Sequence, residues 1–156
     1  MFQQAIEIAG NFTRPIFTIL RRYGHKEIIP GSATIFFVNE DAWAVTTKAV
    51  AKIFLDASNI DKKYAEFSEK RKTVSQEEVE SLASSCGYGK DSVAQLKVNF
   101  VGCVDVIKGV QCKLHPTLDL ALIHFEGYER TGYSRPCVFA GSGSDAKPGK
   151  MLCRLG

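Results

Sequence analysis

Histidine and cysteine are the residue types of this chain that most readily bind metals or act as bases and nucleophiles. The three histidines, His25, His115 and His124, have spacings that match no zinc-binding pattern. The five cysteines form no Cys-x-x-Cys pair: Cys86, Cys103, Cys112, Cys137 and Cys153. Because their number is odd and no two share that spacing, we predict no zinc site and no complete disulfide framework, and we expect no other metal and no cofactor. Reduced thiols are typical of a cytoplasmic protein, which we expect here, and a nucleophilic cysteine is the alternative.

A group of basic residues in the middle of the chain could bind an anionic ligand: Lys62, Lys63, Lys70, Arg71 and Lys72. Glu66 and Glu69 are interleaved with them, so the group also suits an ordinary solvated helix face. The net charge of the chain is only +3, with a pI near 8.6. Binding to nucleic acid needs a concentrated basic patch, so the charge of the whole chain does not favour a nucleic acid partner.

Two serines lie in a glycine-rich segment that could carry a nucleophile. Ser142 and Ser144, in the segment AGSGSDA, partly match the Gly-x-Ser-x-Gly motif of serine hydrolases. The segment lacks the final glycine and the strand–turn–helix context of that motif, so we expect an ordinary loop.

The elements that must position these residues are mostly strands. β-Branched and aromatic residues recur in short runs bounded by glycine, proline and asparagine. We predict strands at residues 15–23, 33–38, 42–47, 92–110, 118–127 and 137–141, and from Lys150 onward. The Asn-Glu-Asp segment between the second and third strands suits a tight hairpin. After the two threonines that end the third strand, we expect a turn of small residues.

A polar and charged segment at residues 57–92 interrupts the strands and predicts an insertion of two helices. Tyr64 and Phe67 are spaced to lie on one face of the first helix. Ser75 followed by Glu78 forms a capping-box pattern at the start of the second.

Strands at regular spacing with one helical insertion indicate a mainly β barrel or sandwich. The length of 156 residues predicts one domain that covers residues 1–156. The sequence has no run of 18 apolar residues, so we predict no membrane span. The first 15 residues lack the pattern of a signal peptide.

Three segments, in this order, carry a family resemblance: GSATIFFVNEDAWAVTTKAV, HPTLDLALIHFEG and SDAKPGKMLCRLG. Together they resemble the N-terminal barrel of the trypsin-like serine peptidases, most of all the bacterial HtrA-like branch. In that family the first segment leads to the catalytic histidine, the second opens with the triad aspartate, and the third closes the first barrel. The resemblance implies a six-stranded antiparallel β-barrel, from which the two-helix insertion is a departure.

The resemblance assigns roles to single residues. Trp43 matches the tryptophan that begins the histidine strand, and Thr46 matches the Ser or Thr before the turn. The position of the catalytic histidine then falls on Ala49, preceded by Lys48, and no nearby register finds a histidine. Asp119 matches the triad aspartate.

These assignments bear on activity, because the triad histidine must take a proton from the serine and return it to the leaving group. Alanine cannot do this, and Lys48 could do so only if strongly desolvated. The resemblance therefore implies a catalytically inactive peptidase homologue, a pseudopeptidase that binds a protein or peptide. One alternative is a serine endopeptidase completed by residues beyond Gly156, where the family has its second barrel. Another is a basic module that binds nucleic acid or an anionic surface. A lone first barrel would expose an apolar face, so we expect a second barrel or a partner chain to cover it.

Overall fold

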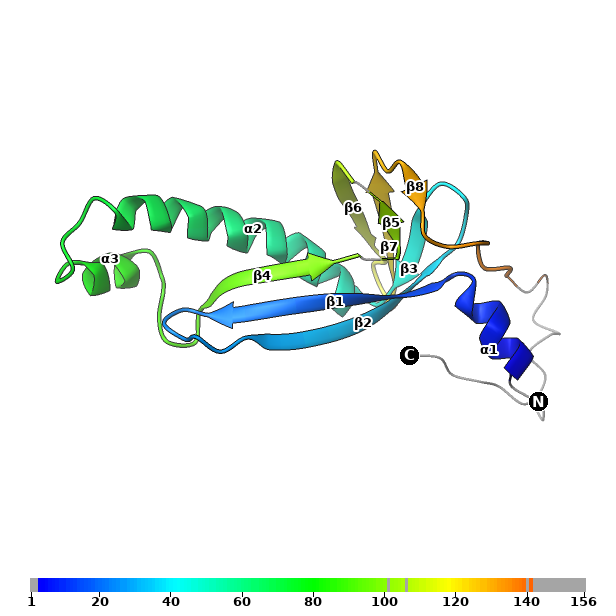
Figure 1. Cartoon of the computed structure of the whole chain (residues 1–156), viewed down its shortest axis with the longest axis horizontal. Coiled ribbons are helices and arrows are strands. Elements are labelled where there is room, and N and C mark those ends of the chain that lie inside the picture. The colour runs from blue at the N-terminus through cyan, green and yellow to red at the C-terminus, as the bar shows by residue number, and fades with distance from the viewer. Residues whose placement is uncertain (1–2, 101, 106, 140, 142–156) are drawn as a thin grey trace. The chain divides into compact units, whose positions relative to one another are not determined.

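The computed structural model describes residues 3–100, 102–105, 107–139 and 141. This part of the chain is mainly β, as predicted, and it also contains three helices, of which α2 is the longest element of all (Figure 1). Its elements are α1 (Gln3–Gly10), β1 (Thr13–Arg22), β2 (Ile29–Phe37), β3 (Trp43–Thr46), α2 (Lys48–Arg71), α3 (Val79–Ser85), β4 (Val93–Asn99), β5 (Val104–Asp105), β6 (Gly109–Leu114), β7 (Ala121–Glu126) and β8 (Arg130–Thr131).

Six of these strands form one sheet in the order β4-β1-β2-β3-β7-β6, and β5 pairs with β8. The predicted six-stranded antiparallel barrel is confirmed in part: the sheet has six strands paired antiparallel, and β4 and β6 are the two ends of its strand order. The single strand predicted at 92–110 is wrong: β4, β5 and the start of β6 occupy it, and Gly102 turns the chain between β4 and β5 with a φ of 80°. The strand predicted from Lys150 lies outside the described residues.

The contacts divide the chain into two compact units. The first consists of Met1–Ile16, Ala33–Ala51 and Phe100–Gly156. The second consists of Phe17–Ser32 and Lys52–Asn99. The candidate sites below each lie within one of these units.

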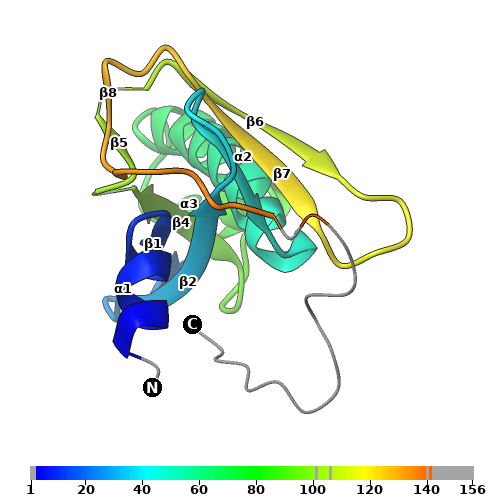
Figure 2. The same cartoon turned by 90° about the vertical axis from the view of Figure 1, so that its right-hand side faces the viewer.

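In the first unit, the strand β7 has the alternation of a half-buried strand. Ala121, Ile123 and Phe125 are buried, and the residues between them are more exposed. Phe125 packs against Phe37, which is also fully buried and stacks on Tyr133 with ring centroids 3.9 Å apart. β6 and β7 run side by side as an antiparallel hairpin (Figure 2).

The turn between β2 and β3 is fixed by its own side chain, as the Asn-Glu-Asp segment predicts. Asn39 Oδ1 accepts hydrogen bonds from the backbone N–H groups of Asp41 and Trp43, both at 3.1 Å. Ala42 has a φ of 55°, and its buried N–H donates to the Tyr133 hydroxyl at 3.1 Å. The turn therefore sets where the tryptophan strand begins.

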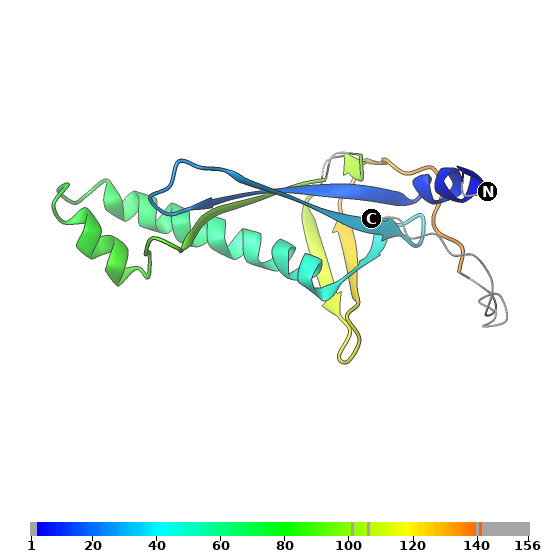
Figure 3. The same ribbon diagram turned by 90° about the horizontal axis from the view of Figure 1, so that it is seen from below.

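In the second unit, α2 lies along β1 and β4 (Figures 1 and 3). Phe67 is 2% exposed, and its ring contacts those of Tyr23, Tyr64 and Tyr88, with centroids 5.6, 6.1 and 4.8 Å away. Tyr64 and Phe67 therefore share one face of the helix, as their spacing predicts. This aromatic cluster is the part of the core that attaches α2 to the strands.

Two helices do follow β3, but the first begins earlier than predicted. Residues 48–52, expected to be a turn, form the first turns of α2. The Thr47 carbonyl accepts a hydrogen bond from the N–H of Ala51, and the Thr47 hydroxyl accepts one from the N–H of Val50. Lysine and alanine favour helices, so these residues can form the start of the helix. The insertion therefore begins at Lys48 rather than at residue 57.

The second helix is shorter than the capping-box pattern suggests. Glu78 Oε2 accepts hydrogen bonds from the Ser75 hydroxyl at 2.8 Å and the Ser75 N–H at 3.1 Å. These two hydrogen bonds lower the pKa of the Glu78 carboxyl. The helix itself begins only at Val79 and ends before Gly87, which has a φ of 77°.

Candidate functional site

Asp119 and Ala49 are far apart in the sequence, and the sheet of the first unit brings them together. β3 pairs antiparallel with β7, with Thr46 opposite Ala121, so the end of β3 lies beside the start of β7. Asp119 precedes β7, and its Oδ1 accepts a hydrogen bond from the backbone N–H of Lys48 at 3.0 Å. Lys48 is the residue directly before Ala49.

In the structure Asp119 acts as a helix cap. A carboxylate at the N-terminus of α2 satisfies a free N–H group and complements the helix dipole. Ala49 supplies only a methyl group. The Lys48 ammonium donates to the carbonyl of Pro116 at 3.4 Å, and in the described part of the chain no hydroxyl nucleophile is hydrogen-bonded to it.

The described contacts of the histidines do not involve Asp119. His115 Nδ1 accepts the N–H groups of Thr117 and Leu118 at 3.2 and 3.0 Å, which closes its own turn. The ring of His124 stacks on that of Trp43, with centroids 4.4 Å apart. Among the described residues, Asp119 accepts no hydrogen bond from a histidine.

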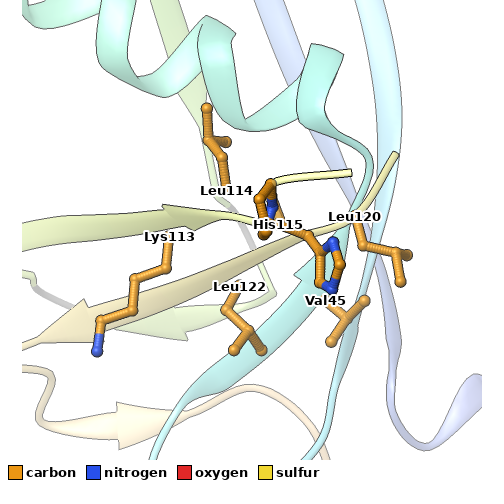
Figure 4. Close-up of a pocket in the computed structure, with 8 residues that line it drawn as sticks. Val45, Lys113, Leu114, His115, Leu120 and Leu122 are labelled. Carbon is orange, nitrogen blue, oxygen red and sulfur yellow. The ribbon is translucent and has the colours of Figure 1, made fainter. Parts of the chain in front are cut away.

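An apolar cavity of about 380 Å³ lies on the face of β3 and β7 that is opposite their buried core side chains. Val45 and Leu122 are opposite one another in the two strands and both line the cavity (Figure 4). The lining residues are Val45, Lys113, Leu114, His115, Pro116, Leu120, Ala121 and Leu122. Leu120 and Leu122 are 45% and 38% exposed, which is high for leucine. The sequence predicts that His124 shares their face, and the burial pattern of β7 confirms it.

The same face continues from the cavity along the strands. Trp43 is opposite His124, and Lys113 Nζ lies 5.5 Å from the centroid of the Trp43 ring. This face is therefore apolar and aromatic, with a single ammonium group above the tryptophan. The sequence contained a signal for it in the alternation of β7, but no motif pointed to Val45 or Lys113.

β6 ends the strand order, so one edge of it has no partner strand in the described part of the chain. The N–H of His115 donates to the carbonyl of Leu120 at 2.9 Å. In the antiparallel register of β6 and β7 this pairing repeats at every second residue, which includes Lys113. The backbone N–H and C=O groups of Cys112 and Leu114 therefore point toward the open edge.

The basic group predicted to bind anions is divided by the structure. Lys72 forms an ion pair with Glu69 at 2.6 Å. Lys63 and Lys70 line a hollow of the second unit together with Glu66. Arg71 lines a different cavity, and Lys62 is exposed on α2 without lining either. The group is not one continuous patch.

The four described cysteines carry free thiols: Cys86, Cys103, Cys112 and Cys137. Cys103 is fully buried, and its Sγ lies 3.7 Å from the carbonyl oxygen of Pro15. Burial raises the pKa of the Cys103 thiol to about 11. A thiol with so high a pKa is a poor nucleophile at neutral pH.

Other predicted features lie beyond these sites. Ser142, Ser144 and the segment SDAKPGKMLCRLG fall outside the described residues. Within the described ranges, no three His, Cys, Asp or Glu side chains come together as a metal site would require. No helix in the described part of the chain has the length and apolar character needed to cross a membrane. Comparison of the chain with family models, with curated proteins and with solved structures found no match.

Proposed function

We propose that this chain is a homologue of the first barrel of the trypsin-like serine peptidases that has lost the triad histidine. Support comes from the site geometry: the tryptophan strand ends beside the segment that carries Asp119. The hydrogen bond from Lys48 places the Asp119 carboxylate next to Ala49, where that family has its histidine. The six-stranded antiparallel sheet is compatible with the barrel of that family.

The function that we propose is the binding of an extended peptide segment by strand addition to β6. The observation that carries this proposal is the open edge of β6 beside the apolar cavity. An added strand would bond to the N–H and C=O groups of Cys112 and Leu114 that point away from β7. Every second side chain of the peptide would then face the same side as Leu122 and Lys113, where the cavity lies.

The chemistry of the cavity specifies the peptide. Its lining is mostly leucine, valine and proline, so it selects an aliphatic side chain. Lys113 is the one ammonium group in the lining, and it favours an acidic or C-terminal carboxylate nearby. We therefore expect alternating aliphatic residues followed by a carboxylate.

Strand addition can be tested with fluorescein-labelled octapeptides in which leucine alternates with threonine and the last residue is glutamate. Binding is measured by fluorescence anisotropy. N-Methylation of every second peptide nitrogen removes donors on one edge of the peptide only. One of the two methylated sets should lose affinity by about ten-fold or more, and the other should bind as the parent does.

A pair of leucine variants checks that the cavity is used. Leu122→Asp places a charge in the lining and should abolish binding. Leu118→Asp makes the same change at a leucine that is 53% exposed and does not line the cavity. Equal losses in both variants, or equal effects of both methylated sets, would contradict strand addition at this site.

Absence of catalysis is tested separately with casein and a mixed peptide library. We expect no cleavage, because Ala49 cannot transfer a proton. Cleavage by the wild-type chain that is lost in Asp119→Ala would show that the aspartate serves a working active site and would refute this part of the proposal.

A further inference from the structure

The second unit contains a small cavity of about 260 Å³ in which basic side chains from separate elements meet. Its lining comes from the end of β1, the turn that follows, α2 and β4: Arg21, Arg22, Tyr23, Gly24, His25, Tyr64, Arg71 and Ala94. No acidic residue is among them. We propose that this cavity binds a phosphate dianion, either as inorganic phosphate or as the terminal group of a phosphate ester.

The charge of the cavity matches such a ligand. Arg22 is paired with Asp91, Nη1 to Oδ1 at 3.1 Å. Arg21 and Arg71 have no ion-pair partner within the described ranges. Three arginines and one aspartate leave a net charge of +2, and a phosphate monoester carries about −1.5 to −2 at pH 7.

Arg21 provides the most specific observation. Its Nε is buried, and no described residue accepts a hydrogen bond from it. A buried N–H without an acceptor destabilises the fold unless a ligand or water supplies one. The guanidinium group presents its donors in a planar fork that matches two oxygens of a phosphate. A phosphate in the cavity would accept hydrogen bonds from the terminal Nη groups of this fork, because the buried Nε is closed to solvent.

The arrangement of the strand explains why an arginine is found there. The pairing of β1 with β4 is in register up to Arg21 and shifts at Arg22, which is paired with Val93. Such an irregularity redirects side chains at the end of a strand. Arg71 reaches the same cavity from the last turn of α2, where Lys70 and Arg71 also complement the helix dipole.

Size restricts the ligand to a compact group. Pockets for drug-sized ligands and cofactors measure about 300–1,000 Å³, and this cavity is smaller. Tyr64 is the one lining residue of α2 besides Arg71. The cavity can therefore hold a phosphoryl group, while any organic part of an ester would remain outside.

The proposal differs from binding by a diffuse basic helix face. Such a face would depend on all five basic residues of the sequence group, including Lys62. The cavity depends instead on Arg21, which lies on a different element and outside that group, and on Arg71. Replacement of single residues distinguishes the two arrangements.

The experiment is a titration of the full chain with inorganic phosphate and with phenyl phosphate at low ionic strength. Binding is measured from the shifts of the amide signals in ¹H–¹⁵N NMR spectra. Arg21→Met and Arg71→Met should each weaken binding by about ten-fold or more. Lys62→Met removes the same charge from an exposed position of α2 that does not line the cavity, and its affinity should stay within about two-fold of wild type.

Arg21→Lys separates the planar fork from its charge and should also weaken binding, although the net charge is unchanged. Amide spectra of the free variants establish that each remains folded. Tighter binding of phenyl phosphate would identify the ligand as an ester, and equal binding would identify it as the free anion. No saturable binding, or equal losses in Lys62→Met and Arg21→Met, would overturn the proposal.

Discussion

Replacement of Ala49 by histidine tests whether Asp119 stands where a triad aspartate would act. Ala49 is exposed, so an imidazole can be added there without displacing core residues. The carboxylate already contacts the adjacent residue, with Lys48 N and Asp119 Oδ1 3.0 Å apart. Ala49→His should therefore place a titratable ring close to a negative charge.

The size of the effect follows from the exposure of the pair. Two unit charges about 4 Å apart interact by about 1 kcal/mol in water, and both Ala49 and Asp119 are exposed. This energy should raise the pKa of the introduced imidazole by about 0.7 above its ordinary value of about 6.5. The gain in stability should be fully present below that ordinary value and be lost as the pH rises past the raised pKa.

The assay is an NMR titration of the imidazole protons in Ala49→His, with the same variant carrying Asp119→Asn as its control. The aspartate-dependent rise in pKa should disappear in the control, because asparagine has the shape of aspartate without its charge. Equal imidazole pKa values in the two backgrounds would refute the proposed relation between the positions.

Three further predictions concern stability and reactivity. Phe67→Ala should lower the free energy of unfolding by about 3–5 kcal/mol, measured by urea denaturation, because the ring is only 2% exposed. Tyr133→Phe should cost about 1–3 kcal/mol in the same assay, because the buried N–H of Ala42 would lose its acceptor; a neutral effect would contradict that bond. Cys103 should resist iodoacetamide at pH 8 while the exposed Cys86 reacts, since burial raises the pKa of the Cys103 thiol to about 11; equal labelling by mass spectrometry would disagree.

Much of the fold could be predicted because its strands carry local signals. The β-branched run of β1, the Asn39 turn and the alternation around Ile123 each indicate their element without reference to the rest of the chain. The start of α2 has only part of its signal in the local sequence. The Thr47 hydroxyl accepts the N–H of Val50, but the Asp119 carboxylate that caps Lys48 comes from a distant segment.

The two candidate sites also differ in how far the sequence could predict them. A motif pointed to Asp119, whose Oδ1 accepts a hydrogen bond from the backbone N–H of Lys48. No motif indicated the cavity that we propose to bind phosphate, because Arg21 and Arg71 come together only through the packing of α2 against the strands. The basic group around Arg71 was predicted because its members are close in the sequence, whereas the residues that line the cavity are close only in space.

The proposed peptide-binding function is tested most directly by amide hydrogen exchange of the chain with and without the leucine–threonine octapeptide. Strand addition would pair the outward N–H groups of Cys112 and Leu114 with peptide carbonyls. Their exchange should slow by about ten-fold or more in the complex, while the amides of β4 should exchange as in the free chain. Unchanged exchange at Cys112 and Leu114 under saturating peptide would contradict the proposed mode of binding.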